Sequence, residues 1–360
     1  MASILYSFNL TDGQEHTNAS DIFSDDALAE ISMTFAVKVI IFIALTAVML
    51  LIFLGNCLVL LAIYKETILH QPANYLIASL ALSDLLVSVL VMPISLMYEM
   101  TDEWKLGKTV CNVWISLDVL CCTASILNLC VIALDRYWAI TQHVNYIQKR
   151  TTKRMVIMII SVWLVAMVIS VMSLLGFRSK YNSSNQCTIS QNKFYTIFST
   201  FGAFFIPMTV MLFVYWSTFR QAMRHIHGRR QTCLDAVSDC TSTRTFKNDA
   251  VDMASPSLVR KLTARKKLRR GLTSKTSLII QRERRATKTL CIVTGTFLIC
   301  WLPFFLTALI LPFCTSCSLP RAWRSTFLWL GYSNSALNPV IYTKYSKQFQ
   351  NAFRKILHCK

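Results

Sequence analysis

The chain has 360 residues, of which 54% are hydrophobic, a mean hydropathy of +0.46 and a formal net charge of +19. This composition excludes an ordinary soluble globular protein. Seven apolar runs long enough to cross a bilayer follow one another, near residues 37–64, 75–98, 110–134, 155–176, 194–219, 290–312 and 326–343. Runs of this length without alternation form helices and not a β-barrel, so the sequence predicts an all-α membrane protein with a seven-transmembrane helix bundle.

The charge distribution predicts the orientation of the bundle. Residues 1–34 contain acidic but no basic side chains, whereas Lys and Arg are concentrated in 221–281 and in the short connection 144–154. Because basic loops stay on the cytoplasmic side of a membrane, we expect the N-terminus outside the cell and the C-terminus inside. The basic segment then suits a membrane surface or an acidic protein, and nucleic acid is not expected as a partner.

These boundaries divide the chain into five parts. They are an outer tail at 1–34, helices one to five at 35–220, a basic and largely disordered inner loop at 221–281, helices six and seven at 282–344, and a short amphipathic helix on the inner leaflet with the C-terminal tail at 345–360. Asn9, Asn18 and Asn182 begin Asn-X-Ser/Thr triplets on the outer side and are candidate glycosylation sites. Cys359 is a candidate palmitoylation site.

The third apolar run carries an acid near its outer end. At 1.5 Å per residue, Asp118 lies roughly 27 Å from Arg136 along one helix, which places the two near opposite faces of a bilayer. A bare carboxylate at the centre of a membrane-spanning helix costs about 2.5 kcal/mol or more, so Asp118 must face protein, water or a cation. It is either a buried acid satisfied by internal hydrogen bonds or the counter-ion of an amine ligand, and we favour the counter-ion.

Asp84 is a second acid at membrane depth. Polar residues of other helices can meet it inside the bundle, and the candidates are Asn56, Ser125, Asn334 and Asn338. A hydrogen-bonded cluster that holds the helices together explains these residues without a ligand.

The fifth and sixth runs carry residues that suit an aromatic ligand. Ser199 and Ala203 are one helical turn apart, so a hydroxyl and a small residue share a face, although such hydroxyls often bond their own backbone. In the sixth run Pro303 predicts a kink. Trp301, Phe304, Phe305 and Ala308 share a face there, either as core packing or as a cage for an amine.

Four segments resemble the rhodopsin-like (class A) aminergic G-protein-coupled receptors. They are Asp118 to Thr123, Ile132 to Tyr137, Cys300 to Phe305 and Asn338 to Tyr342. The resemblance covers roughly 37–220 and 282–358 and is strongest to type-1 serotonin receptors, particularly type 1A. The segments that carry this closer resemblance are Ser116 to Ser125, Tyr195 to Phe204, Ala308 to Cys314 and Gln350 to Phe353. Two features depart from the pattern: the fourth helix has no proline after Trp163, and Leu328 stands where type-1A receptors usually have Asn.

The resemblance implies a set of ligand-binding residues. A protonated amine pairs with Asp118, its ring stacks against Phe304 and Phe305, and its hydroxyl reaches Ser199 or Thr200. The implied set is Asp118, Val119, Cys122, Thr123, Ser199, Thr200, Ala203, Trp301, Phe304, Phe305, Ala308, Trp329 and Tyr332.

The resemblance also implies a switch that couples the ligand to a G protein. At rest, Arg136 pairs with Asp135 and Glu283, and the ligand favours a state in which the inner end of the sixth helix swings outward. The implied coupling residues are Asp135, Arg136, Tyr137, Tyr215, Glu283, Pro303, Asn338, Pro339 and Tyr342. The family's allosteric sodium pocket is matched by Asp84, Ser125, Asn334 and Asn338.

The resemblance further implies a disulfide between Cys111 and Cys187, which would hold the outer loop over the ligand entrance. For Cys314 and Cys317, a second bridge and two free thiols are both open. No spacing among the thirteen cysteines indicates a zinc site, and beyond allosteric sodium no metal or cofactor is expected.

The expected function is that of a plasma-membrane receptor for a biogenic amine, serotonin in the first place, which lowers adenylyl cyclase activity through the inhibitory Gi/Go class. Arrestin, receptor kinases and membrane lipid are further expected partners. A receptor for octopamine, tyramine or dopamine is the nearest alternative. An amine transporter is a remote one, because the two halves show no inverted repeat of broken helices. An enzyme is not expected, since Ser, His and carboxylates form no catalytic pattern.

Overall fold

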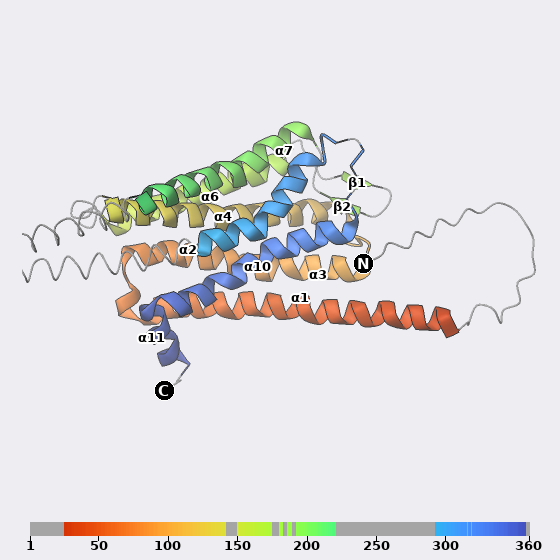
Figure 1. The fold of residues 1–360 in the computed structure, drawn as a ribbon, viewed down its shortest axis with the longest axis horizontal. Helices are drawn as coiled ribbons and strands as arrows, with labels where there is room; N and C mark the ends of the chain where they lie inside the picture. The colour runs from red at the N-terminus through yellow and green to blue at the C-terminus, as the bar shows by residue number, and fades with distance from the viewer. Residues whose placement is uncertain are drawn as a thin grey trace, which may run out of the picture. The chain divides into compact units, whose positions relative to one another are not determined.

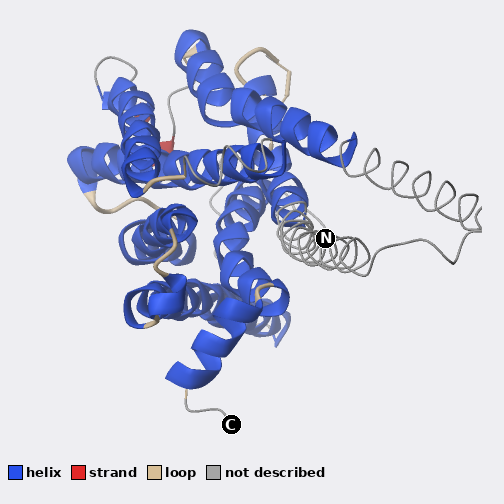
Figure 2. Cartoon of the chain, turned by 90° about the vertical axis from the view of Figure 1, so that its left-hand side faces the viewer, coloured by secondary structure: helices blue, strands red, loops and turns tan. Residues whose placement is uncertain are grey.

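The computed structural model describes residues 25–141, 150–174, 180–182, 186–188, 192–220, 292–314, 316–317 and 319–357. Almost all of this part of the chain is helix, and its strands are confined to one short hairpin (Figure 2). The chain divides into two compact units, Met1–Leu45 and Thr46–Lys360. The described part of the first unit is the N-terminal stretch of one long helix.

That helix, α1, is longer than a bilayer requires. It runs from Asp25 to Lys65, which is 41 residues. At 1.5 Å per residue its length is about 60 Å, twice the thickness of the hydrocarbon core. The stretch apolar enough to cross a membrane is Phe35–Lys65. The helix therefore begins inside the segment that the sequence suggested as an outer tail.

All seven predicted helices are present. Six in the described part of the chain are long and apolar enough to cross a membrane, namely Phe35–Lys65, Pro72–Thr101, Gly107–Ala139, Thr152–Met172, Lys193–Arg220 and Ile292–Ile310. The seventh is α10 (Arg321–Tyr345). It is more polar than the others because its buried face carries Tyr332, Asn334, Ser335 and Asn338.

Two of the spans contain a π-helical turn that the sequence reasoning did not anticipate. The turn Val87–Val91 joins α2 (Pro72–Leu86) to α3 (Met92–Thr101), and the turn Phe201–Phe205 follows α7 (Lys193–Thr200). Each turn comes just before a proline, Pro93 or Pro207. Proline lacks an N–H and its ring clashes with the carbonyl four residues earlier, so a wider turn there relieves the clash without ending the helix.

The helix α4 (Gly107–Thr141) lies between α2 and α6 (Thr152–Leu174) and contacts both (Figure 1). Ala124 of α4 and Ala166 of α6 are fully buried in one cluster with Val162. Small residues at such a crossing let two membrane helices approach closely. This contact fixes the position of α4, which carries Asp118.

Side-chain hydrogen bonds strengthen the same packing. The Ser170 hydroxyl donates to the Ser116 carbonyl oxygen at 2.6 Å and ties the outer part of α6 to α4. The Trp163 indole donates to the Ser79 hydroxyl at 3.1 Å and ties α6 to α2. The fourth helix, which has no proline after Trp163, is therefore anchored by a serine near its outer end.

A short antiparallel hairpin follows α6. Strands β1 (Lys180–Asn182) and β2 (Gln186–Thr188) pair with Tyr181 opposite Cys187. Cys187 forms a disulfide with Cys111 of α4, with a Cα–Cα distance of 5.8 Å. Cys314 and Cys317 are bridged as well, which settles the choice that the sequence left open.

After α10 the chain turns into the amphipathic helix α11 (Lys347–Ile356). Phe349 and Phe353 are buried, and Phe349 stacks on Tyr342 of α10 at a ring-centroid distance of 5.6 Å. On the polar side, Lys355 pairs with Glu66 at 2.9 Å. The helix expected in 345–360 is thus held to the bundle by rings on one face and an ion pair on the other.

Candidate functional site

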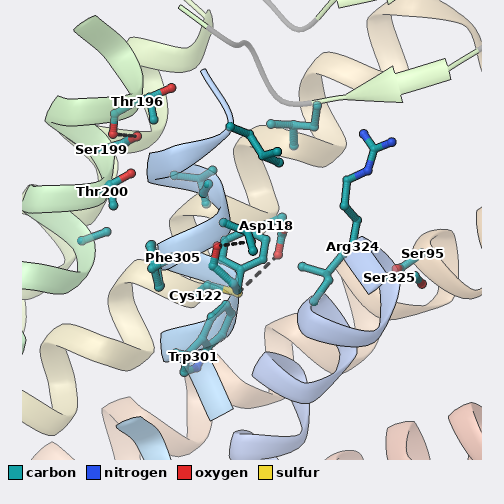
Figure 3. A pocket seen from close by; sticks show the side chains of 18 of the residues that line it. Ser95, Asp118, Cys122, Thr196, Ser199, Thr200, Trp301, Phe305, Arg324 and Ser325 are labelled. Atoms are coloured by element: carbon teal, nitrogen blue, oxygen red, sulfur yellow. Dashed lines mark hydrogen bonds between the residues drawn. The ribbon is translucent and has the colours of Figure 1, made fainter. Parts of the chain in front are cut away.

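A cavity of about 320 Å³ opens between α3, α4, α7, α10 and the helix Ile292–Ile310 (Figure 3). Eleven of the thirteen ligand-binding residues implied by the sequence line it: Asp118, Val119, Cys122, Thr123, Ser199, Thr200, Ala203, Trp301, Phe304, Phe305 and Ala308. The other two, Trp329 and Tyr332, are buried against each other behind the cavity wall, with ring centroids 5.7 Å apart.

Asp118 is the charged group at the centre of this cavity. Its side chain is 8% exposed, and its Oδ1 accepts hydrogen bonds from the Tyr332 hydroxyl at 3.0 Å and the Cys122 thiol at 3.2 Å. No lysine or arginine in the described chain forms an ion pair with it. A buried carboxylate with two weakly acidic donors and no cation is stabilised by a ligand that brings a positive charge.

Aromatic rings form the wall next to Asp118. Phe304 and Phe305 meet edge to face at 5.3 Å, and both contact Trp301 at 5.7 Å. Phe305 also stacks on Phe204, which lies in the π-helical turn after α7, at 4.3 Å. The aromatic residues therefore both pack the core and line the cavity.

A glycine that the sequence reasoning missed allows this arrangement. A Cβ atom on Gly331 would lie 2.7 Å from the Trp301 ring, closer than any Cβ contact can be. Gly331 precedes Tyr332, so the close approach of α10 to Trp301 also brings the Tyr332 hydroxyl to Asp118. In the sequence, a glycine within a membrane-spanning helix was the only sign that another side chain approaches the backbone closely there.

The α7 side of the cavity carries hydroxyl groups. Ser199 donates to the carbonyl oxygens of Tyr195 at 2.8 Å and Thr196 at 3.3 Å, the backbone bonding that the sequence left as one interpretation. Thr200 is buried and Thr196, which was not predicted, also lines the cavity. The Asn192 side chain caps α7 by accepting from two backbone N–H groups, which fixes the start of this helix.

The outer end of the cavity is polar, and the sequence did not indicate it. The Ser325 hydroxyl of α10 donates to the Glu99 carboxylate of α3. The Arg321 guanidinium lies 4.8 Å from the Tyr98 ring centroid and donates to the Tyr98 carbonyl oxygen at 2.9 Å. Arg324 lines the same end. These residues come from the ends of two helices whose sequences are far apart, so only the fold brings them together.

Comparison with known proteins agrees with this geometry. Residues 55–342 match the model of the 7 transmembrane receptor (rhodopsin family). The chain belongs to the rhodopsin family of seven-transmembrane receptors. It is therefore a multi-pass membrane receptor and not an enzyme.

Three curated receptors are similar to this chain over most of its length. The 5-hydroxytryptamine receptor 1A of Xenopus laevis is 39% identical over 358 residues, 85% of this chain and 88% of that receptor. The 5-hydroxytryptamine receptor 1D of Canis lupus familiaris is 40% identical over 340 residues, 90% of each chain. The 5-hydroxytryptamine receptor 1A-alpha of Takifugu rubripes is 41% identical over 375 residues, 90% and 89% of the two chains.

This rhodopsin-family receptor has a second polar centre around Asp84, which is fully buried. One carboxylate oxygen accepts from the hydroxyls of Ser125 at 2.7 Å and Ser335 at 2.9 Å, and the other accepts from the Asn338 amide at 2.8 Å. Ser335 was not predicted. Asn334, which was, is buried with its side-chain oxygen unpaired among the described residues.

The oxygen atoms of this centre suit a small hard cation. The side-chain oxygens of Asn334 and Asn338 are buried without a hydrogen-bond partner in the described chain. Carboxylate, hydroxyl and amide oxygens are the donors that hard cations prefer, so these residue types fit the predicted sodium ion.

At the inner end of α4, Asp135 is buried and its carboxylate accepts two hydrogen bonds from the Arg150 guanidinium, one of them at 2.9 Å. The sequence did not indicate Arg150. The expected pairing of Arg136 with Asp135 and Glu283 stays a prediction, because Glu283 lies outside the described residues.

The remaining predicted residues fall in several places. Tyr137 lies near the inner end of α4, Tyr215 is 44% exposed, and Pro303 and Pro339 lie inside helices. Asn9, Asn18 and Cys359 lie outside the described residues. Asn182 is in β1, but its side chain is not described.

Proposed function

We propose that this receptor binds a protonated biogenic amine, with serotonin as the first candidate, and signals through the inhibitory Gi/Go class of G protein. The observation that carries the proposal is Asp118: a buried carboxylate at the wall of a cavity, with hydrogen-bond donors but no ion pair to any described lysine or arginine. An ammonium group placed there replaces the missing positive charge, and the water-poor cavity strengthens the attraction.

The neighbouring residues favour an aromatic amine. Phe304 and Phe305 line the same cavity as Asp118, so a ring attached to the ammonium by a short chain can contact their rings. Thr200 and Ser199 lie on the opposite side, where a ring hydroxyl would reach them. The volume of about 320 Å³ is at the small end for ligand cavities, as a monoamine requires.

The relatives favour serotonin among the amines. All three receptors described above are named for 5-hydroxytryptamine. Ala203 supports the same choice, because a catechol-binding receptor typically offers another serine at this place. Octopamine, tyramine and dopamine remain the alternative ligands, to be separated by competition against serotonin.

The coupling mechanism follows from the position of Trp301. The ring lies at the bottom of the cavity, contacts both phenylalanines and fits against Gly331 of α10. A ligand that displaces it acts on the sixth helix two residues before the kink expected at Pro303. Ligand binding thereby favours a state with the inner end of this helix displaced, where a G protein docks.

A sodium ion held by Asp84, Ser125, Asn334 and Asn338 is part of the same proposal. When bound, it would add a positive charge between α2, α4 and α10. The proposal also includes an extracellular N-terminus that is glycosylated at its asparagines and a palmitoylated Cys359. Arrestin and receptor kinases are further proposed partners.

The test is a cyclase assay in cells against a panel of biogenic amines, with an Asp118→Asn variant. The loss of one charged partner should lower serotonin potency about 100-fold or more. Glu99→Gln is the matched control, since it removes a carboxylate from the outer end of the same cavity. Surface expression is measured for both variants. Unchanged potency in the expressed Asp118→Asn variant would contradict the proposal.

A further inference from the structure

The first turn of α10, at the outer end of the cavity, has an unusual charge pattern. It contains Arg321 and Arg324 and no acidic residue. The N-terminal end of a helix carries a partial positive charge, so two cations there are unfavourable unless something compensates them. Where a sequence breaks such a local rule, a functional reason is to be sought.

One of these arginines is compensated within the receptor. Arg321 donates to the carbonyl oxygens of Tyr98 and Asp102, lies over the Tyr98 ring, and approaches the Asp102 carboxylate at 3.4 Å. Its charge therefore holds the outer ends of α3 and α10 together.

The charge of the second arginine, Arg324, is not compensated in this way. Arg324 lines the cavity and is exposed, and in the described part of the chain its guanidinium has neither an ion pair nor a hydrogen bond. Figure 3 shows its side chain extending from α10 away from Asp118, toward the outer end of the cavity. Glu99 of α3 also lines this end of the cavity, but its carboxylate accepts a hydrogen bond from Ser325 and not from Arg324.

The cavity thus has opposite charges at its two ends. Arg324 and Tyr332, whose hydroxyl binds Asp118, are eight residues apart on α10, which is a rise of about 12 Å. A small monoamine on Asp118 does not span this length. An amine with a chain on its nitrogen does, and the chain can run past Ser95 and Leu328, which line the cavity between the two ends.

We propose that Arg324 is an anion-binding subsite of the ligand cavity, selecting amines whose nitrogen substituent ends in a carboxylate. This inference rests on the amine function proposed above. A guanidinium binds a carboxylate through two parallel hydrogen bonds, a geometry that an ammonium cannot offer. Bound in this way, the ligand carries a cation to Asp118 and an anion to Arg324, so each end meets its opposite charge.

A competing arrangement is a second cation site at Glu99, which lines the same end of the cavity. Its carboxylate already accepts the Ser325 hydroxyl, and Arg324 and Arg321 raise the local potential against a second ammonium. The two arrangements differ in sign, so ligands of opposite terminal charge separate them.

The experiment measures binding to the full-length receptor in membranes. The probes are serotonin and three N-alkyl derivatives with the same chain, which end in a carboxylate, a primary carboxamide or an amine. Each chain is prepared in a series of lengths. In the wild type, the carboxylate is expected to bind more tightly than the carboxamide at the best length. In Arg324→Gln the carboxylate-ended probe should lose about fivefold to tenfold in affinity, while the affinities of the carboxamide-ended probe and of serotonin stay unchanged.

Two variants serve as controls. Arg324→Lys keeps the charge without the paired geometry and should recover part of the loss. Lys105→Gln removes an exposed positive charge near the outer end that does not line the cavity, and it should leave the carboxylate preference intact.

Equal affinity of carboxylate and carboxamide for the wild type, or an equal loss in Lys105→Gln, would overturn the subsite while serotonin binding stands. Preference for the amine-ended probe, lost in Glu99→Gln, would overturn it in favour of a cation site. Failure of serotonin itself to bind would overturn both proposals.

Discussion

Asp84 and Asp118 are both buried at membrane depth in the described part of the bundle, and their surroundings differ. Asp84 accepts hydrogen bonds at both oxygens from three helical donors and lines no part of the cavity. Asp118 accepts at one oxygen and borders the cavity. The carboxylate of Asp84 has side-chain donors on both oxygens, whereas that of Asp118 has donors on one oxygen and faces the space in which we propose an amine binds. Both were visible as acids in apolar runs, and only the contacts show that one borders the cavity and the other does not.

Asp84→Ala is expected to have the largest effect on stability. The change leaves Ser125, Ser335 and Asn338 without their shared acceptor, at a cost of about 3 kcal/mol. Thermal unfolding of the detergent-purified receptor measures it. Asp118→Ala, which leaves two weaker donors, should lower the transition temperature less. A larger loss in Asp118→Ala would break the comparison between the two acids.

Gly331→Ala tests how the Asp118 site is assembled. The added Cβ would clash with Trp301, so the Trp301 ring or α10 must shift, and either change disturbs the packing beside Tyr332 and Asp118 at a cost of about 1–3 kcal/mol. Serotonin affinity should fall in saturation binding. The control is Gly295→Ala in the sixth helix, where a Cβ meets no atom within 4 Å and alanine favours the helix. Equal affinities in the two variants would show that the close approach is not required.

Two single donors sharpen the comparison further. Ser335→Ala removes a donor to Asp84, and Tyr332→Phe removes a donor to Asp118. Each loss is worth about 1 kcal/mol, but we expect the serine variant to lower the transition temperature and the tyrosine variant to lower amine affinity. Transition temperature and amine affinity are therefore measured on both variants. If both variants changed the same property, the two acids would not have separate roles.

The smallest effect, a change in basal signalling, is expected at a third buried acid, Asp135. Arg150 pairs with it from the connection before α6. Because Asp135 is buried, removing the arginine leaves its carboxylate without this partner and weakens this arrangement. Arg150→Ala should raise basal cyclase inhibition by a few fold at constant expression. Thr152→Ala, a nearby change that leaves the ion pair intact, should not.

The sequence predicted the helices for a physical reason. Apolar length identifies a membrane helix, and an acid such as Asp118 within one must face the interior. The residues that line the cavity came from the family resemblance, and their role in ligand binding stays a prediction. The Cys111–Cys187 bridge followed from the family resemblance.

What the sequence did not reveal depends on side-chain contacts between distant segments. Gly331 matters only because Trp301 comes from another helix, and Ser335 only because it faces Asp84. The Arg150 partner of Asp135 and the cluster of Glu99, Arg321 and Ser325 are contacts of the same kind. The π-helical turns before Pro93 and Pro207 depend on how each helix accommodates its proline within the bundle.

The most direct test of the account changes the charge on the ligand and the receptor together. Serotonin and its uncharged analogue, in which a hydroxyl replaces the ammonium, are measured by competition binding on the wild type and on Asp118→Asn. If Asp118 binds the ammonium, the wild type prefers serotonin about 100-fold and the variant loses nearly all of that preference. The same preference in both receptors would mean that the ligand's charge is recognised elsewhere, and the central claim would be wrong.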